Sequence, residues 1–278
     1  KWIRDSPCRQ CAPRRSQLHL HGQVERARID GSPYDAGMFE TLQAAMDILR
    51  QSRGLRETAA ALVPALRTRR VLNLGPLPEA DAGGGAVRAL RRARNELKGH
   101  LSDGKFDYAA VRSSGAYARL QALAPALRET TPEALPTDAA RIAFFLNVYN
   151  VLALHGVIAL DIQKSVMEVP AFFDIVAYDI GGAVISLNEM ENGVLRLNAG
   201  HPATGRPTLP ADHPGHRFAP SYVEPRIHAS LVCASTSCPA VGFYDPEHLE
   251  AQLDLATRHW VNADVRVVGG ELHLPGMF

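Results

Sequence analysis

The sequence predicts an α+β fold in which a long buried central helix packs on a small, mainly antiparallel sheet. Helical and strand-like segments are grouped along the chain instead of alternating regularly. Residues 138–160 are apolar on nearly all sides, which is typical of a helix buried in a core. Residues 226–233 alternate between two sets of side chains with a period of two, which is typical of a strand.

The composition is that of a globular protein with an ordinary surface. Hydrophobic residues make up 46% of the 278 residues, and charged residues make up 21%. The formal net charge is +1 and the isoelectric point is near 7.9, so neither nucleic acid nor an acidic membrane surface is expected as a partner. We expect a helical or irregular N-terminal extension with a linker over residues 1–85, and an α+β domain over residues 86–278.

The N-terminal region is less regular than the rest of the chain. Residues 1–31 are polar and rich in arginine, and we expect a tail or docking arm that could hold a protein partner. Residues 1–15 have no apolar centre and do not resemble a secretory signal. Helical spacing of apolar residues predicts helices at 38–49 and 55–66. The prolines and glycines of residues 75–85 predict a linker.

Cysteine content and hydropathy favour a reducing, cytoplasmic location without a membrane span. Four cysteines in a chain of this length do not make a disulfide scaffold. Cys8 and Cys11 have the spacing of a redox pair, but the helix that should follow such a pair is not predicted here. The most apolar segment, residues 142–160, is interrupted by two asparagines and a histidine, so we do not expect it to cross a bilayer.

The next part of the chain predicts the helices of the domain. Residues 86–101 and 108–127 are expected to form two charged helices. Thr137 or Asp138 can cap the long apolar helix, which we expect to continue to about Leu160. Because this helix has almost no polar face, it is predicted to be the central buried element.

A hairpin and a helix start are predicted after the central helix. Residues 173–178 and 183–185 are strand-like, and the two glycines at 181–182 suit the turn between them. Ser186 and Glu189 have the spacing of a capping box, in which each side chain bonds the backbone N–H of the other residue.

The C-terminal part predicts a loop, a helix and a second hairpin. Residues 200–220 are rich in proline, glycine and histidine and are expected to form a loop. Residues 245–260 predict a helix, with Asp245 as its cap and Pro246 in its first turn. Residues 265–268 and 271–274, joined by two glycines, predict the hairpin.

The segment 226–239 concentrates the residue types that carry chemistry. His228 lies on the predicted strand, which ends near Cys233. The small residues 234–237 allow the close approach of a ligand or another backbone, and Cys238 follows them before a proline. A potential base and a potential nucleophile are therefore expected in one small region.

Three motifs resemble the domain-of-unknown-function family five-four-seven (DUF547). They are Phe144-Phe145-Leu146-Asn147-Val148-Tyr149-Asn150, residues 186–196 and residues 224–239, in that order and at familiar spacing. The resemblance extends from about residue 106 to the C-terminus. The family pattern continues beyond Phe278 with an aromatic, acidic segment, so we expect this chain to stop short of the family domain.

The resemblance implies a compact α+β domain, which we compare with papain-like thiol hydrolases. By that analogy Cys238 is the nucleophile, His228 is the general base, and Glu191 orients the imidazole. A thiol with an ordinary pKa of about 8.5 needs a nearby imidazole or helix N-terminus to form a thiolate at neutral pH. The expected supporting or substrate-binding residues are Asn147, Asn150, Arg226, Cys233 and Ser237.

Structural roles are open as alternatives for the same residues. Cys233 lies on the apolar face of the predicted strand, which favours burial as a small hydrophobe. His228 could bond a neighbouring backbone group, and Cys238 could be a packed turn thiol. Glu191 could pair with Arg196, although a spacing of five residues is poor for a helix ion pair.

The two asparagines of the central helix need buried partners. Asn147 and Asn150 lie one turn apart on an otherwise apolar helix, and buried amides are almost always hydrogen-bonded. We expect them to hold a loop, such as residues 233–238, rather than to act directly in catalysis.

A metal site is the competing chemical interpretation. His228, Cys233 and Cys238 are three soft ligands, but their spacing does not match ordinary zinc motifs. A fourth ligand would have to come from Glu191 or from the histidines of the 200–220 loop. The sequence contains no Walker loop, dinucleotide fingerprint or Gly-x-Ser-x-Gly elbow, and we expect neither a metal nor a cofactor.

Two functional hypotheses follow from these residues. The first is a thiol-dependent hydrolase or transferase that acts on an amide or thioester, in a peptide or a small thiol compound. The second is a non-catalytic protein-interaction module in which the same polar residues are structural. Reactivity of the cysteine thiols across pH distinguishes the two hypotheses.

Overall fold

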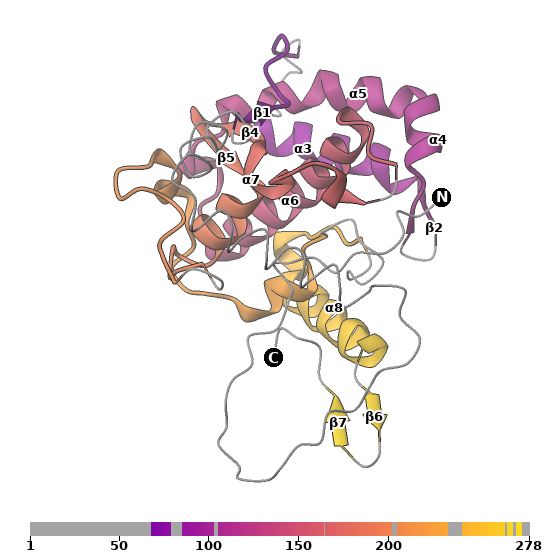
Figure 1. The fold of residues 1–278 in the computed structure, drawn as a ribbon. Coiled ribbons are helices and arrows are strands. Elements are labelled where there is room, and N and C mark those ends of the chain that lie inside the picture. Colours follow the sequence, from indigo (N-terminus) through magenta and orange to yellow (C-terminus); the bar gives the residue numbers. More distant parts are fainter. Residues whose placement is uncertain are drawn as a thin grey trace, which may run out of the picture. The chain divides into compact units, whose positions relative to one another are not determined.

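The computed structural model describes a helix-rich fold with a small sheet (Figure 1). The described residues are 68–78, 85–102, 105–163, 165–201, 205–232, 241–264, 266–268 and 271–273. The expected N-terminal arm and the expected helices at 38–49 and 55–66 lie outside these residues. The described helices and strands all belong to one compact unit that includes Arg69–Phe278.

Helix α6 (Asp138–Ala159) is the central buried element, as predicted. The Thr137 hydroxyl caps it by accepting the Ala140 N–H at 3.1 Å. Every residue from 142 to 158 is buried. Among the described helices α6 alone is long and apolar enough to cross a membrane by length and composition, and 94% of its most apolar window is buried inside the fold.

The sheet is three-stranded and mixed, with the order β1-β4-β5. Strand β1 (Arg70–Val71) pairs parallel with β4 (Val176–Ile180), and β4 pairs antiparallel with β5 (Ala183–Ser186). The two glycines at 181–182 take positive φ angles of 58° and 84° in the turn, so the predicted hairpin is confirmed. Strand β1 precedes the expected domain start at residue 86, yet it forms an edge of this sheet.

Helix α3 (Gly85–Lys98) confirms the first predicted helix of the domain. Its buried side is formed by every third or fourth residue, among them Leu90, Arg94 and Leu97. A short hairpin of β2 (Leu101–Ser102) and β3 (Lys105–Phe106) follows it.

The single helix predicted over residues 108–127 is wrong, because the chain breaks at Ser114. Helix α4 (Tyr108–Ser113) ends there, since the Ser114 backbone is extended with ψ 165°. The Ser114 hydroxyl accepts the Ala116 N–H at 3.2 Å and caps α5 (Gly115–Leu123). Serine competes with helical hydrogen bonds through its own side chain, which favours such a break.

Short helical turns complete the connections between the longer elements. Pro125 lies in the first turn of the 3₁₀ helix η2 (Ala124–Glu129), where a missing N–H costs little. Further short turns are η3 (Pro132–Ala134), η4 (Val166–Glu168), α7 (Phe172–Ile175) and η6 (Pro214–Phe218).

The predicted C-terminal helix and hairpin are both confirmed, with one correction at the helix start. A 3₁₀ turn, η8 (Pro246–His248), leads into α8 (Leu249–Asp264), and the strands β6 (Arg266–Val268) and β7 (Glu271–His273) pair antiparallel. Asp245 does not cap this helix through its side chain. Its carboxylate instead accepts a hydrogen bond from Arg94 at 2.6 Å.

The strand predicted at residues 226–233 is wrong. The chain forms a 3₁₀ helix there, η7 (Pro225–Ala229), and the three-stranded sheet contains no strand from this region. Pro225 fixes the first helical φ angle, and the Glu224 carboxylate accepts the Arg226 N–H at 2.9 Å. The α+β class is confirmed, with a buried central helix and a small sheet, but the sheet is mixed instead of mainly antiparallel, because β1 pairs parallel with β4.

Candidate functional site

Two of the three expected catalytic side chains face one another. Oε1 of Glu191 lies 3.4 Å from Nδ1 of His228. The Glu191 side chain is 12% exposed and the His228 side chain is 25% exposed. The carboxylate is therefore mostly buried behind an imidazole that solvent can still reach.

Glu191 lies in an unusual helical segment. Residues 189–195 form a π-helical turn, η5 (Glu189–Leu195), and the Arg196 N–H reaches back five residues to the Glu191 carbonyl at 3.0 Å. The Arg196 side chain donates to Asn192 Oδ1 at 2.6 Å. Arg196 therefore bonds a different neighbour, and the Glu191 carboxylate faces His228. π-helical turns are rare and often occur at functional sites.

The start of this helical segment is fixed by the predicted capping box, which is confirmed. Oε2 of Glu189 accepts the Ser186 N–H at 2.9 Å, and the Ser186 hydroxyl accepts the Glu189 N–H at 3.3 Å. Arg69 adds an ion pair to Oε1 of Glu189 at 2.5 Å and a hydrogen bond to the Val184 carbonyl. Glu189, two residues before Glu191, is thus held by partners from two segments, Ser186 at the end of β5 and Arg69.

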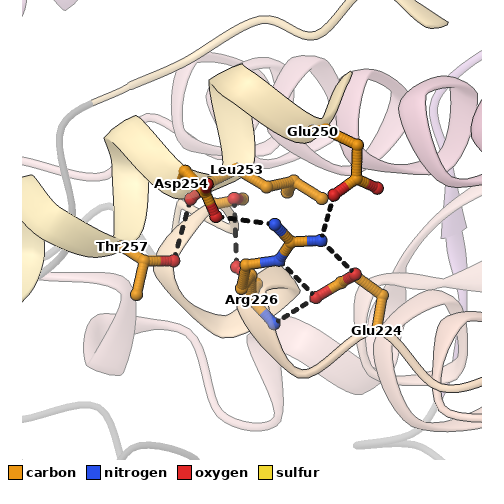
Figure 2. A network of polar contacts seen from close by, with 7 residues as sticks. Glu224, Arg226, Glu250, Leu253, Asp254 and Thr257 are labelled. Carbon is orange, nitrogen blue, oxygen red and sulfur yellow. Dashed lines mark hydrogen bonds and ion pairs between the residues drawn. The ribbon is translucent and has the colours of Figure 1, made fainter. Parts of the chain in front are cut away.

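His228 is positioned by the short helix η7, which an arginine ties to α8. The Arg226 guanidinium bonds three carboxylates at once (Figure 2). These are Glu224 through Nε at 2.8 Å and Nη2 at 2.7 Å, Glu250 through Nη2 at 2.7 Å, and Asp254 through Nη1 at 2.7 Å. These bonds tie η7, which carries His228, to α8, so Arg226 supports the fold beside His228.

The carboxylates around Arg226 are not equivalent. The Glu224 side chain is 6% exposed, whereas that of Glu250 is 73% exposed. Hydrogen bonds from the Arg226 side chain hold the pKa of Glu224 below its ordinary value. The Arg226–Glu224 pair is thus the buried part of the network, and the pairs to α8 form its outer part.

Asn150 of α6 binds the backbone on both sides of residues 233–240. Its Oδ1 accepts the Val232 N–H at 3.0 Å. Its Nδ2 donates to the Ser230 carbonyl at 3.0 Å and to the Gly242 carbonyl at 2.9 Å. One buried amide therefore joins the two ends of the segment that contains both candidate thiols.

Asn147, one turn earlier on α6, holds the chain just after that segment. Its Nδ2 donates to the Tyr244 carbonyl at 2.7 Å, and its Oδ1 accepts the Tyr244 N–H at 2.8 Å. Arg94 of α3 donates to the same carbonyl at 2.9 Å. Burial raises the pKa of Tyr244 to about 12, so its phenol is neutral at physiological pH.

The remaining expected site residues fall outside the described part of the chain. Cys233, Ser237 and Cys238 all lie within residues 233–240. Cys8 and Cys11 lie within residues 1–67, which are also outside it. The predicted approach of the Cys238 sulfur to His228 is therefore still a prediction.

The described residues contain no group of three or more metal-binding side chains that could hold an ion. Two histidines of the 200–220 loop are engaged in local hydrogen bonds. Nδ1 of His213 accepts the Gly215 N–H at 3.0 Å, and Nε2 of His216 bonds the Pro210 carbonyl at 2.8 Å.

The Glu191–His228 pair has the chemistry of an oriented base. A carboxylate that faces Nδ1 favours the tautomer whose Nε2 can accept a proton. No described residue bonds Nε2 of His228. The arrangement can therefore take a proton from a group that approaches the exposed side of the ring.

Sequence reasoning did not identify Arg94, Tyr244 and Arg69 as parts of this region. Arg94 could have been noticed, because it lies on the apolar side of the predicted helix 86–101 between Leu90 and Leu97. Tyr244 and Arg69 contribute through long-range backbone or carboxylate contacts, and no local pattern marks such contacts.

Comparison with known proteins found one family model that part of this chain matches. No curated protein and no solved structure matches the chain. Residues 132–261 match the family model described as "Protein of unknown function, DUF547". The match starts later than the expected position near residue 106, but it contains all three motifs and both members of the Glu191–His228 pair. The similarity to the DUF547 family is therefore found over residues 132–261.

Proposed function

We propose that this domain is a thiol-dependent hydrolase or transferase that acts on an amide or thioester. Cys238 is the nucleophile, His228 is its general base, and Glu191 orients the imidazole. The observation that carries the proposal is the 3.4 Å approach of Glu191 Oε1 to His228 Nδ1. These residues come from separate motifs, and their meeting is what a catalytic carboxylate–imidazole pair requires.

The hydrogen bonds to the chain on either side of residues 233–240 support the same proposal. A nucleophile must be held close to its base, and a loop can hold it only if its ends are fixed. Asn150 and Asn147 fix the chain at Val232, Gly242 and Tyr244 with buried hydrogen bonds. Burying two amides in the central helix is costly unless they are hydrogen-bonded, and here their bonds go to the backbone on either side of residues 233–240.

The proposed reaction follows the ordinary course of thiol acyl transfer. Nε2 of His228 takes the proton of the Cys238 thiol, and the sulfur attacks the carbonyl carbon of the substrate. The C–N or C–S bond of the substrate breaks, and the leaving amine or thiol takes the proton from the imidazolium. Water or an acceptor thiol or amine then attacks the acyl–enzyme, releases the acid or the new acyl product, and restores the Cys238 thiol.

The proposed arrangement is papain-like by analogy only. The histidine precedes the cysteine in this sequence, the reverse of the papain order, and a carboxylate stands where papain-like sites use an amide. Triads are defined by geometry, so neither difference excludes the chemistry. The substrate class that fits the proposal is a peptide or a small thiol compound.

A non-catalytic interaction module is the second candidate. It is favoured by the hydrogen bonds that the side chains of Asn147, Asn150 and Arg226 make within the fold. In that case the Glu191–His228 pair also serves the fold, and the thiols of residues 233–240 have ordinary reactivity.

Thiol labelling across pH tests the proposal. The full chain is treated with iodoacetamide between pH 5 and pH 9, and the labelling rate of each cysteine is followed by mass spectrometry. The proposal expects rapid labelling of Cys238 at pH 6. The labelling rate of Cys238 should rise at a pH well below the pKa of about 8.5 of an ordinary thiol. Cys233→Ser should keep that profile and Cys238→Ser should remove it. Equal, slow labelling of all four cysteines at pH 6 would favour the interaction module.

A further inference from the structure

A chain of side-chain hydrogen bonds runs along the π-helical turn that carries Glu191. Nη1 of Arg196 donates to Asn192 Oδ1 at 2.6 Å, and Asn192 Nδ2 donates to Asn188 Oδ1 at 2.8 Å. Asn188 Nδ2 then donates to Asp174 Oδ1 at 2.7 Å. A guanidinium only donates and a carboxylate only accepts, so the two ends of the chain fix the orientation of both amides.

Asn192 is the buried link of this chain, with a relative exposure of 2%, and it follows Glu191 directly. Arg196 is bound at both residues, because its backbone N–H donates to the Glu191 carbonyl at 3.0 Å and its side chain donates to Asn192. In an α-helix the same N–H would bond the carbonyl four residues back, that of Asn192. A change to that register would turn Glu191 by about 100° relative to Arg196 and move its carboxylate away from His228.

The backbone that follows the turn is also held by an amide side chain. Leu197 and Asn198 take positive φ angles of 54° and 56°. Asn198 Oδ1 accepts the N–H groups of Thr208 and Leu209 at 2.7 and 2.9 Å, and its Nδ2 donates to the Leu209 carbonyl at 2.9 Å. Backbone strain of this kind persists only where the surrounding contacts fix it, and it is common at active sites.

We propose that Asn192 is a positioning residue for the Glu191–His228 pair. Its amide fixes Arg196 against the turn and keeps the π-helical register, and so holds the Glu191 carboxylate against Nδ1 of His228. This role rests on the proposed function only for its effect on Cys238, because the orientation of the imidazole can be measured without any reaction.

The tautomer of His228 measures this role directly. A carboxylate at Nδ1 favours the tautomer that carries the proton on that nitrogen. Nitrogen-15 chemical shifts of the histidine-labelled full chain distinguish the two tautomers at about pH 8.5, where an ordinary imidazole is neutral. The chain has 11 histidines, and the His228→Gln variant identifies the signals of His228. The wild type should carry the proton mainly on Nδ1.

An exchange of an amide and a carboxylate tests the chain of hydrogen bonds itself. Asn192→Asp still accepts from Arg196, but its second oxygen faces Asn188 Oδ1, and turning the Asn188 amide only moves the conflict to Asp174. We expect the Nδ1–H fraction of His228 to fall at least about twofold. Adding Asp174→Asn supplies a donor at the far end, so every bond can form again at unchanged total charge. The double variant should therefore regain the wild-type tautomer.

Three further variants serve as controls. Asp174→Asn alone keeps an oxygen that accepts the Asn188 amide, so the tautomer should not change. Asn95→Asp makes the same substitution at an exposed position of α3 and should leave the tautomer unchanged as well. Asn188→Ala removes the middle link at a half-buried position that water can reach, so it tests the chain even where Asn192→Asp does not fold. It should lower the Nδ1–H fraction in the same direction.

Three results would overturn the role of Asn192. One is a wild-type ring that carries its proton mainly on Nε2. Another is a wild-type tautomer in both Asn192→Asp and Asn188→Ala. The third is a double variant that behaves like Asn192→Asp, which would mean that the chain of hydrogen bonds does not carry the effect. Iodoacetamide labelling of Cys238 in the same variants reports separately on the proposed function, because a tautomer that responds without any change in labelling would leave the positioning role intact and remove Cys238 as the nucleophile.

Discussion

The centre of α6 and the region around His228 are built from different kinds of contact. Around α6, residues 142–158 are buried almost entirely by apolar packing. Around His228, the chain forms short 3₁₀ and π-helical turns that side chains hold by hydrogen bonds to distant backbone or carboxylate groups. The first region is stabilised by area buried from water, and the second by a small number of polar contacts that must all be present.

The largest effect is expected at the amide that links the two regions. Asn150→Ala leaves the Val232 N–H and two carbonyls without partners inside the fold. At about 1–3 kcal/mol for an orphaned group, we expect a loss of about 4 kcal/mol in the free energy of unfolding. Urea denaturation measures it, and Asn95→Ala, at an exposed position of α3, serves as control with a change of about 0.5 kcal/mol or less. Similar losses in both variants would contradict the polar account of this region.

A second effect comes from the one buried histidine of α6. Nδ1 of His155 lies 2.7 Å from the Tyr178 hydroxyl, and burial lowers the His155 pKa from its ordinary value of 6.5 to about 4. Between these two pH values the unfolded chain binds a proton that the folded chain does not. The contribution of neutral His155 to the free energy of unfolding is therefore fully present above pH 6.5. It falls by about 3 kcal/mol as the pH drops to 4.

Denaturation at several pH values tests this dependence on His155. The double variant His155→Leu with Tyr178→Phe replaces both polar partners, and it should lose about 3 kcal/mol less than the wild type between pH 7 and pH 4. Tyr178→Phe alone keeps the imidazole and should keep the wild-type dependence. An unchanged dependence in the double variant would show that other groups cause the acid sensitivity.

A smaller effect is expected in the Arg226 network, where burial differs among the carboxylates. Arg226→Met leaves the buried Glu224 carboxylate unpaired, and we expect a loss of about 2–3 kcal/mol. Glu250→Gln removes only an exposed partner, and its cost should be about 0.5 kcal/mol or less. Thermal and urea unfolding compare the two variants. Equal costs would mean that the burial of Glu224 does not matter.

The smallest effect is expected for the proposed nucleophile. Cys238→Ser neither creates a large cavity nor buries an unpaired charge, so the free energy of unfolding should change by less than about 1 kcal/mol. A substantially larger loss in urea unfolding would favour a structural role for this thiol.

The difference between the apolar packing around α6 and the polar contacts around His228 explains which sequence predictions succeeded. Helix α6, the β4–β5 hairpin and the Ser186–Glu189 capping box are local patterns, and all three were predicted correctly. The strand at 226–233 was predicted from alternation alone, but Pro225 and the Glu224 cap impose a 3₁₀ turn. Alternation over a few residues does not distinguish a strand from a tight turn. Here the turn is stabilised by ion pairs with distant residues, such as the pair between Arg226 and Glu250.

Within the candidate site, the sequence predicted only contacts between residues of the three motifs. The Glu191–His228 approach was expected from the resemblance and is found in the structure at 3.4 Å. The contacts of Arg94 and Arg69 were not expected, because each joins residues more than a hundred positions apart. Such contacts depend on the completed fold and leave no periodic signal in the sequence.

The most direct test of the account is the effect of His228 on the reactivity of Cys238. The rate of iodoacetamide labelling at Cys238 is measured from pH 5 to pH 9 in the wild type, His228→Gln, Glu191→Gln and the double variant. If His228 is the base and Glu191 acts through it, His228→Gln should slow labelling at pH 6 at least about tenfold, Glu191→Gln should slow it less, and the double variant should match His228→Gln. Identical profiles in all four proteins would contradict the proposed site.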